Sequence, residues 1–108
     1  MNHKGAYGKL VRDRIPEIIR EGGAEPMTYV AGPGEYRDRL RDKLVEEVAE
    51  FLAADDAKAP EELADVLEVV LALAAALGVD ARQLEEIREG KASERVGFTE
   101  RIVWTGNR

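Results

Sequence analysis

Acidic residues interrupt the apolar stripes of two consecutive helical segments, and this interruption restricts the folds that the chain can adopt. In the first segment, a step of about 100° per residue places Leu40, Leu44 and Phe51 on one stripe. Glu47 falls inside this stripe, and Glu50 lies at its edge. Folding must therefore bury Glu47 beside a group that compensates its charge.

The second segment repeats the pattern. Its apolar arc includes Val66, Val69 and Leu73, with Glu62 inside the arc and Asp65 flanking it. Ionised carboxylates that face a core cost several kcal/mol each unless they are paired or bind a cation. Four carboxylates converging between two antiparallel helices suit a hard cation with oxygen ligands, so the pattern indicates Mg²⁺, with Mn²⁺ as a substitute.

Acidic runs on helices also have a simpler explanation. Most are solvated faces, which add solubility or form i,i+4 ion pairs such as Lys43 with Glu47. Either acidic run alone fits this explanation as well as it fits a metal site. The repetition on two consecutive helices, each time inside the apolar stripe, favours the metal site.

Length and charge narrow the classes of protein. A chain of 108 residues fits one domain, which we place over residues 1–108. With 22 acidic against 16 basic residues, the formal charge of −6 argues against a duplex nucleic-acid partner. The chain has no cysteine, and its one histidine is His3, so a histidine-based hydrolase is excluded and a zinc site is implausible.

The longest apolar stretch, residues 69–77, is far shorter than the roughly 20 residues that span a bilayer. No signal peptide precedes the domain, so we expect a cytoplasmic protein without a membrane partner. The same stretch is apolar on every side, and one small domain can hardly cover it. We therefore expect a homodimer or a larger homo-oligomer. The alternative is an alanine-rich helix with one exposed face.

The spacing of apolar residues predicts four helices. They cover residues 12–20, 35–54, 60–77 and a last segment that Asp80 caps and that ends near Gly90. Residues 27–31 and 98–104 are candidates for two short strands that could pair. The fold class is therefore mainly α, an antiparallel helical bundle with a possible two-stranded β element.

Two groups of motifs resemble a known superfamily. Residues 43–50, KLVEEVAE, and 61–67, EELADVL, resemble the Glu-x-x-Glu and Glu-x-x-Asp signature of the all-α nucleoside triphosphate pyrophosphohydrolases. That superfamily includes MazG, dimeric dUTPases and phosphoribosyl-ATP pyrophosphohydrolase. The segments KLVRDRIP, residues 9–16, and RVGF, residues 95–98, resemble its small MazG-like house-cleaning branch.

The resemblance implies Mg²⁺-dependent hydrolysis of a nucleoside triphosphate, or a related nucleotide, between its α and β phosphates. The products are a monophosphate and pyrophosphate, and the substrates are non-canonical nucleotides. By motif position, the metal ligands are Glu47, Glu50, Glu62 and Asp65. Glu46 lies outside the strict motif and could orient or deprotonate the attacking water, so Glu46 and Glu47 are the catalytic candidates.

Two other functions remain open at this point. One is phosphoribosyl-ATP pyrophosphohydrolase of histidine biosynthesis, which shares the metal motif and the cleaved bond. The other is a non-catalytic helical oligomerisation module, whose acidic residues only make it soluble.

A polyphosphate also needs cations from the protein. The best candidates come from the family-like opening and closing segments: Lys9, Arg12, Arg14 and Arg95. Each of them taken alone is better explained as a surface charge. Phe98 and Trp104 could stack on a base, although aromatic residues of a strand more often belong to the core.

Overall fold

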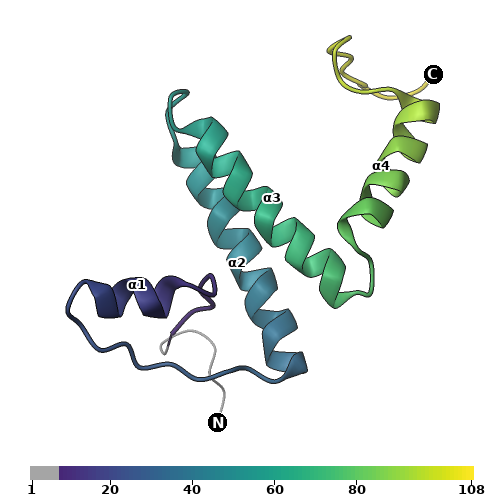
Figure 1. The fold of residues 1–108 in the computed structure, drawn as a ribbon. Helices are drawn as coiled ribbons and strands as arrows, with labels where there is room; N and C mark the ends of the chain where they lie inside the picture. Colours follow the sequence, from purple (N-terminus) through teal and green to yellow (C-terminus); the bar gives the residue numbers. More distant parts are fainter. Residues whose placement is uncertain (1–7) are drawn as a thin grey trace.

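The computed structural model describes residues 8–108, so His3 lies outside the described residues. Four helices follow one another along the chain, and no strand occurs in residues 8–108. They are α1 (Ile15–Glu21), α2 (Pro33–Ala53), α3 (Ala59–Ala76) and α4 (Ala81–Arg95). The chain is therefore mainly α, as the sequence predicts. Figure 1 shows α2 and α3 side by side as an antiparallel hairpin, with α1 to one side of the hairpin and α4 leading away from the end of α3.

Local signals set the helix ends. Proline occupies the first turn of α1, α2 and α3, where a missing N–H costs nothing. Gly78 follows α3 with a φ of 83°, a conformation that glycine adopts readily. Asp80 caps α4, because its side chain accepts a hydrogen bond from the Gln83 N–H and the Gln83 side chain accepts one from Asp80.

Helix α4 continues to Arg95, beyond the predicted end near Gly90. A glycine inside a helix costs only about 1 kcal/mol relative to alanine, which is too little to stop the helix there. The other helix ends lie close to the predicted ones.

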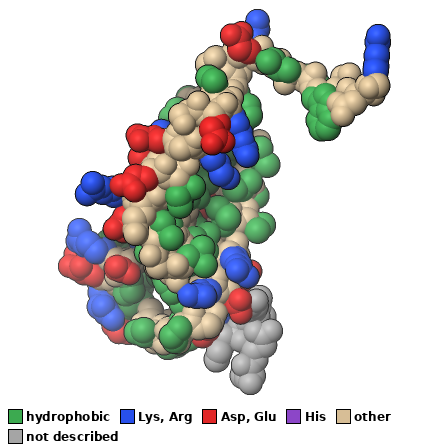
Figure 2. Space-filling view, turned by 90° about the vertical axis from the view of Figure 1, so that its right-hand side faces the viewer, with side chains coloured by type: hydrophobic (Ala, Val, Ile, Leu, Met, Phe, Trp, Pro, Cys, Tyr) green, Lys and Arg blue, Asp and Glu red, His purple; other side chains and the backbone are tan. Residues whose placement is uncertain are grey.

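The buried core is small and lies between α2 and α3. Its buried apolar residues, among those described, are Leu40, Val69 and Ala74. The radius of gyration is 18.0 Å, against about 13 Å for a compact domain of this length. Leu67 and Leu77 remain 55% and 66% exposed, and Figure 2 shows hydrophobic side chains gathered in the middle of one face. One copy of the chain therefore leaves the apolar surface of α3 partly uncovered.

The two predicted strands do not form. In residues 27–31, Met27 and Val30 are each 97% exposed and no partner strand lies beside them in the described part of the chain. In residues 98–104, Arg101 has a φ of 58° and its N–H bonds to the Phe98 carbonyl, which makes a turn and breaks the alternation of a strand.

The aromatic residues of this tail do not belong to the core either. Phe98 is 96% exposed and Trp104 78% exposed.

Across residues 8–108, none of the helices has both the length and the apolar composition needed to cross a bilayer.

Candidate active site

The acidic residues of the two helices meet in the α2–α3 hairpin. Glu47 comes from α2, and Glu62 and Asp65 come from the first two turns of α3. One carboxylate oxygen of each residue lies within 4.8 Å of those of the other two. Ligands on opposite sides of a Mg²⁺ ion, each at about 2.1 Å, are about 4.2 Å apart, so a small inward movement would bring all three oxygens within ligand distance of one ion. We call these three residues the carboxylate cluster.

Two oxygens of the carboxylate cluster are buried without a hydrogen-bond partner in the described part of the protein. They are Oε2 of Glu47 and Oε2 of Glu62. Glu47 is also one of two buried charged residues among those described, with 8% of its surface exposed. A buried carboxylate oxygen without a partner is unfavourable unless something positive meets it. The residues present therefore fit a divalent cation that prefers oxygen ligands.

Glu50 lies one turn after Glu47 on α2 and is exposed. Its pKa is raised from the ordinary value of a glutamate, first by the negative charge of Glu47 and then by desolvation. A hydrogen bond with Glu47 and the charge of Glu62 raise the same pKa further. Glu50 thus shares the electrostatic environment of the cluster, although the three-residue cluster does not include it.

Lys43 is the nearest cation on α2. Its ammonium lies 3.4 Å from Oε1 of Glu47 and 3.8 Å from Oε2 of Glu46, and 18% of its side chain is exposed. The first of these is the i,i+4 pair that the sequence indicated. Lys43 therefore neutralises part of the charge while leaving the second oxygen of Glu47 without a partner.

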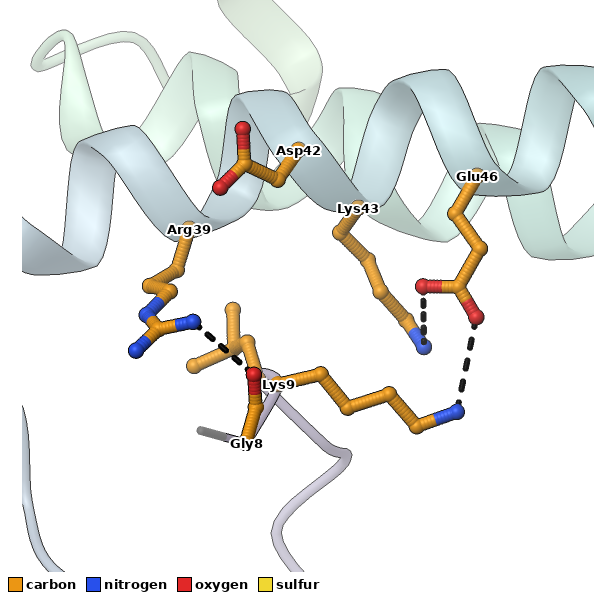
Figure 3. Close-up of a pocket in the computed structure, with 7 residues that line it drawn as sticks. Gly8, Lys9, Arg39, Asp42, Lys43 and Glu46 are labelled. Carbon is orange, nitrogen blue, oxygen red and sulfur yellow. Dashed lines mark hydrogen bonds and ion pairs between the residues drawn. The ribbon is translucent and has the colours of Figure 1, made fainter. Parts of the chain in front are cut away.

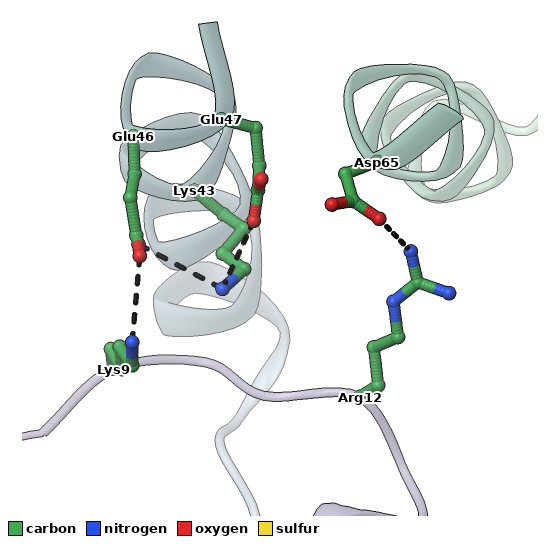
Figure 4. Close-up of polar contacts among 6 residues, drawn as sticks. All are labelled: Lys9, Arg12, Lys43, Glu46, Glu47 and Asp65. Atoms are coloured by element: carbon green, nitrogen blue, oxygen red, sulfur yellow. Dashed lines mark hydrogen bonds and ion pairs between the residues drawn. The ribbon is translucent and has the colours of Figure 1, made fainter. Parts of the chain in front are cut away.

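The segment before α1, residues 8–14, supplies two more cations, and we call it the N-terminal arm. Nη2 of Arg12 donates a 2.9 Å hydrogen bond to Oδ1 of Asp65 on α3. Nζ of Lys9 lies 3.4 Å from Oε1 of Glu46 on α2. Figure 4 shows the arm passing below both helices, with these two side chains pointing up toward the acidic residues. The N-terminal arm therefore brings two positive charges to the acidic residues of α2 and α3.

The other two predicted phosphate ligands are not brought to this place within one chain. Nε of Arg14 pairs instead with Glu17, three residues further along, at 3.3 Å. Arg95 lies in the last turn of α4, and Figure 1 shows that α4 leads away from the α2–α3 hairpin. Their roles in phosphate binding remain predictions.

Arg39 is a residue of this region that sequence reasoning missed. It lines a cavity of about 360 Å³ together with Lys9, Lys43 and Glu46. Figure 3 shows Arg39 bonded to the Gly8 carbonyl at one side of the cavity and the Glu46 ion pairs at the other. The i,i+4 spacing of Arg39 and Lys43 along α2 was the available signal.

A model of the phosphoribosyl-ATP pyrophosphohydrolase family matches residues 9–91. The chain belongs to this family. The phosphoribosyl-ATP pyrophosphohydrolase family is part of the all-α nucleoside triphosphate pyrophosphohydrolase superfamily, so the resemblance seen in the sequence is confirmed. The matched residues include Lys9 and Arg12 of the N-terminal arm and all residues of the carboxylate cluster, and they end before Arg95.

A curated relative from Mycolicibacterium smegmatis, an uncharacterized protein, is 53% identical to this chain over 47 residues. The matched region covers 44% of this chain and 48% of the relative, so the chain spans about half the length of that protein. No solved structure matches the chain.

Membership of the phosphoribosyl-ATP pyrophosphohydrolase family supports a nucleotide pyrophosphohydrolase, which hydrolyses phosphoanhydride bonds. Enzymes of this family and of its MazG-like relatives typically depend on a divalent metal. The carboxylate cluster is the place in the described structure where such an ion could bind.

Proposed function

We propose that this protein is a Mg²⁺-dependent nucleoside triphosphate pyrophosphohydrolase. It cleaves between the α and β phosphates and releases a monophosphate and pyrophosphate, and its substrates are non-canonical nucleotides. The observation that carries the proposal is that Glu47 and Glu62, whose carboxylates meet in the α2–α3 hairpin of a chain in this family, each have a buried oxygen without a hydrogen-bond partner.

Glu47, Glu50, Glu62 and Asp65 hold the metal. A bound divalent ion polarises the phosphoryl oxygens and lowers the pKa of water in the site. The four carboxylates carry more negative charge than one divalent ion neutralises, so a polyphosphate needs further cations. Arg12 and Lys9 reach the carboxylates from the N-terminal arm and supply these cations. These two side chains bind the outer phosphates and offset the charge that develops on the leaving pyrophosphate.

Glu46 orients and deprotonates the attacking water. Its carboxylate pairs with Lys9 at 3.4 Å and with Lys43 at 3.8 Å, next to Glu47. When a polyphosphate draws the Lys9 ammonium toward itself, one oxygen of Glu46 becomes available to accept a proton. In this arrangement Lys9 exchanges one anionic partner for another during the reaction.

A second candidate is hydrolysis of phosphoribosyl-ATP, which breaks the same bond of a larger nucleotide. The description of the matching family favours it. The two candidates differ in the part of the substrate that lies beyond the triphosphate, and not in the chemistry at the metal.

Release of pyrophosphate from a substrate panel tests both candidates. The panel contains phosphoribosyl-ATP, the canonical nucleoside triphosphates, and deaminated or oxidised ones, each with Mg²⁺. A preference for modified triphosphates of at least tenfold in kcat/KM supports the house-cleaning function, and a preference for phosphoribosyl-ATP supports the second candidate. Glu62→Gln should lose turnover of the preferred substrate. Glu61→Gln is the matched control and should keep it, because Glu61 is 75% exposed on the same turn of α3.

A helical module without catalytic activity is the alternative from a different class. Such a module has no reason to bind Mg²⁺ or Mn²⁺ tightly. Absence of heat on titration with either ion, together with no turnover of any member of the panel, would overturn the proposed function.

We also propose that the protein is a homo-oligomer, most simply a twofold dimer. The partly exposed apolar surface of α3 and the extended shape of one copy support this proposal. In a dimer, a second copy covers Leu67 and Leu77 and completes a helical bundle.

A further inference from the structure

Arg39 of α2 is one of the two buried charged residues in the described structure, and the chemistry proposed above does not use it. Its side chain is 7% exposed. Its Nη1 donates a 2.9 Å hydrogen bond to the Gly8 carbonyl, and its Nε lies 3.2 Å from Oε2 of Glu35. Its Nη2 donates to the Tyr29 hydroxyl at 3.4 Å, and that hydroxyl donates to Glu35 in turn. One guanidinium thus joins three segments that are apart in the sequence.

The bond to Gly8 fixes the position where the N-terminal arm meets α2. Gly8 has a φ of 83°, which a side chain would strain, so glycine allows the chain to turn at this contact. Lys9 is the next residue, and Arg12 follows it in the same N-terminal arm. Their ion pairs to Glu46 and Asp65 involve side chains that are 65% and 59% exposed.

Exposed ion pairs contribute little to holding a segment in place, because water screens them and the long side chains lose freedom. The hydrogen bonds of a buried guanidinium are stronger and more directional. Arg39 therefore holds the arm more firmly than Lys9 and Arg12 hold it themselves. It also leaves both of these cations available for another anion.

We infer that Arg39 is a positioning residue for polyphosphate binding: by holding the Gly8 carbonyl, it places Lys9 and Arg12 beside the carboxylate cluster. It acts on the substrate through these two side chains and does not contact the metal. This inference rests on the proposed function, because it assigns a polyphosphate to the site.

Mobility of the arm is the first measurement, and it does not depend on activity. The chain has no cysteine, so Val11→Cys provides a unique site for a spin label on the arm, and Ser93→Cys provides a control site on α4. In Arg39→Met, the label at position 11 becomes mobile in the electron paramagnetic resonance spectrum and the label at position 93 does not. A label at position 11 that stays equally immobile overturns the inference.

Arg37→Met is the matched control. Arg37 lies on the same helix and also donates to a backbone carbonyl, that of Ala76 on α3, at 2.6 Å. Losing this bond leaves the arm in place, so the label at position 11 keeps its spectrum. If Arg39→Met does not fold by circular dichroism, Arg39→Lys replaces it. Lysine retains the buried charge but cannot bond Gly8 and Glu35 with one planar group, so the label becomes partly mobile.

Binding of inorganic pyrophosphate in the presence of Mg²⁺ is the second measurement, by isothermal titration. Arg39→Met weakens this binding about tenfold, whereas the affinity for Mn²⁺ alone changes less than twofold. A structural role of Arg39 in the hairpin would weaken both. Equal losses in the two titrations therefore overturn the inference.

A double-mutant cycle gives the third measurement. In a Lys9→Ala, Arg12→Ala background, adding Arg39→Met weakens pyrophosphate binding less than twofold further, because the side chains that Arg39 positions are already absent. A full additional tenfold loss in this background would show that Arg39 acts by another route.

Failure of the proposed function gives a different result from failure of this inference. If the unsubstituted protein neither binds pyrophosphate with Mg²⁺ nor turns over any nucleotide, the proposed function fails, and the inference about polyphosphate fails with it. If it binds pyrophosphate and Arg39→Met frees the arm without weakening that binding, only the inference fails.

Discussion

Arg12 and Asp65 are 53 residues apart in the sequence and are joined by a 2.9 Å hydrogen bond between Nη2 and Oδ1. The bond ties the N-terminal arm to α3 at the edge of the carboxylate cluster. A metal ion at the cluster would compete with Arg12 for the same carboxylate. Binding of an ion would therefore release the guanidinium for contact with a phosphate.

Glu47→Gln should abolish turnover and leave the metal-free fold intact or more stable. The amide keeps the shape of the side chain but removes a charge whose Oε2 has no partner. We expect kcat/KM to fall by about a thousandfold or more, since metal binding is lost. Pyrophosphate release and the thermal unfolding midpoint in a chelator are the measurements. Asp65→Asn should behave alike, and full activity of either variant would contradict the assignment of these ligands.

Glu62→Gln should weaken Mn²⁺ binding by at least about tenfold, because it removes one ligand of the cluster. Glu61→Gln should leave Mn²⁺ binding within about twofold, because Glu61 is exposed and pairs with Lys58 at 3.9 Å. Isothermal titration of the two variants makes the comparison. Equal affinities would place the metal somewhere other than the cluster.

Glu50→Gln should change how stability depends on pH in the absence of metal. The pKa of Glu50 is raised in the folded state, mainly by the charge of Glu47, so its ionised form is disfavoured on folding. The unsubstituted protein should therefore lose stability as pH rises from the unfolded pKa through the raised one. The variant lacks this loss.

The measurement is the difference in unfolding midpoint between Glu50→Gln and the unsubstituted protein, in a chelator, from pH 4 to pH 7. This difference should increase with pH and then level off. Saturating Mg²⁺ should reverse its sign, because the ion favours the ionised carboxylate. A difference that does not vary with pH would contradict the prediction.

Arg12→Ala should raise KM about tenfold with a smaller effect on kcat, because in the proposed function the guanidinium binds the outer phosphates. Arg14→Ala should change KM less than about twofold, because Arg14 pairs locally with Glu17 on α1. Steady-state kinetics on the preferred substrate of the panel distinguishes them. A larger effect for Arg14 would show that the arm rearranges when substrate binds.

Leu67→Glu should weaken self-association by about a hundredfold or more, because it places a charge in the apolar surface that a second copy would cover in the proposed dimer. Lys58→Glu introduces the same side chain in the exposed connection between α2 and α3 and should leave the oligomer intact. Sedimentation velocity at several concentrations is the measurement. An unsubstituted protein that remains monomeric would contradict the proposed dimer.

The helices and the carboxylate cluster could be predicted because both depend on local patterns. Helical spacing and caps such as Asp80 act within a few residues, and Glu47 and Glu62 interrupt stripes that must face each other in a hairpin. The contacts of the arm depend on pairing across long stretches of chain, which no periodicity encodes. For the same reason the two expected strands were wrong, since a strand forms only when a partner is in reach.

The direction of α4 could not be predicted from the sequence either. The short turn after Gly78 sets it, and it takes Arg95 away from the hairpin. Arg39 was missed because an arginine beside a glutamate on a helix usually forms a surface pair. Its burial depends on the return of Gly8 and Tyr29 to the same place.

The long sequence separation between Arg12 and Asp65 also determines the order in which the parts of the site form. The α2–α3 hairpin joins neighbouring segments, and such contacts form early because the loop to be closed is short. The arm is synthesised first, yet it has no anchor until the hairpin exists. Its docking is therefore a late step, and the negative half of the site is present before the positive half arrives.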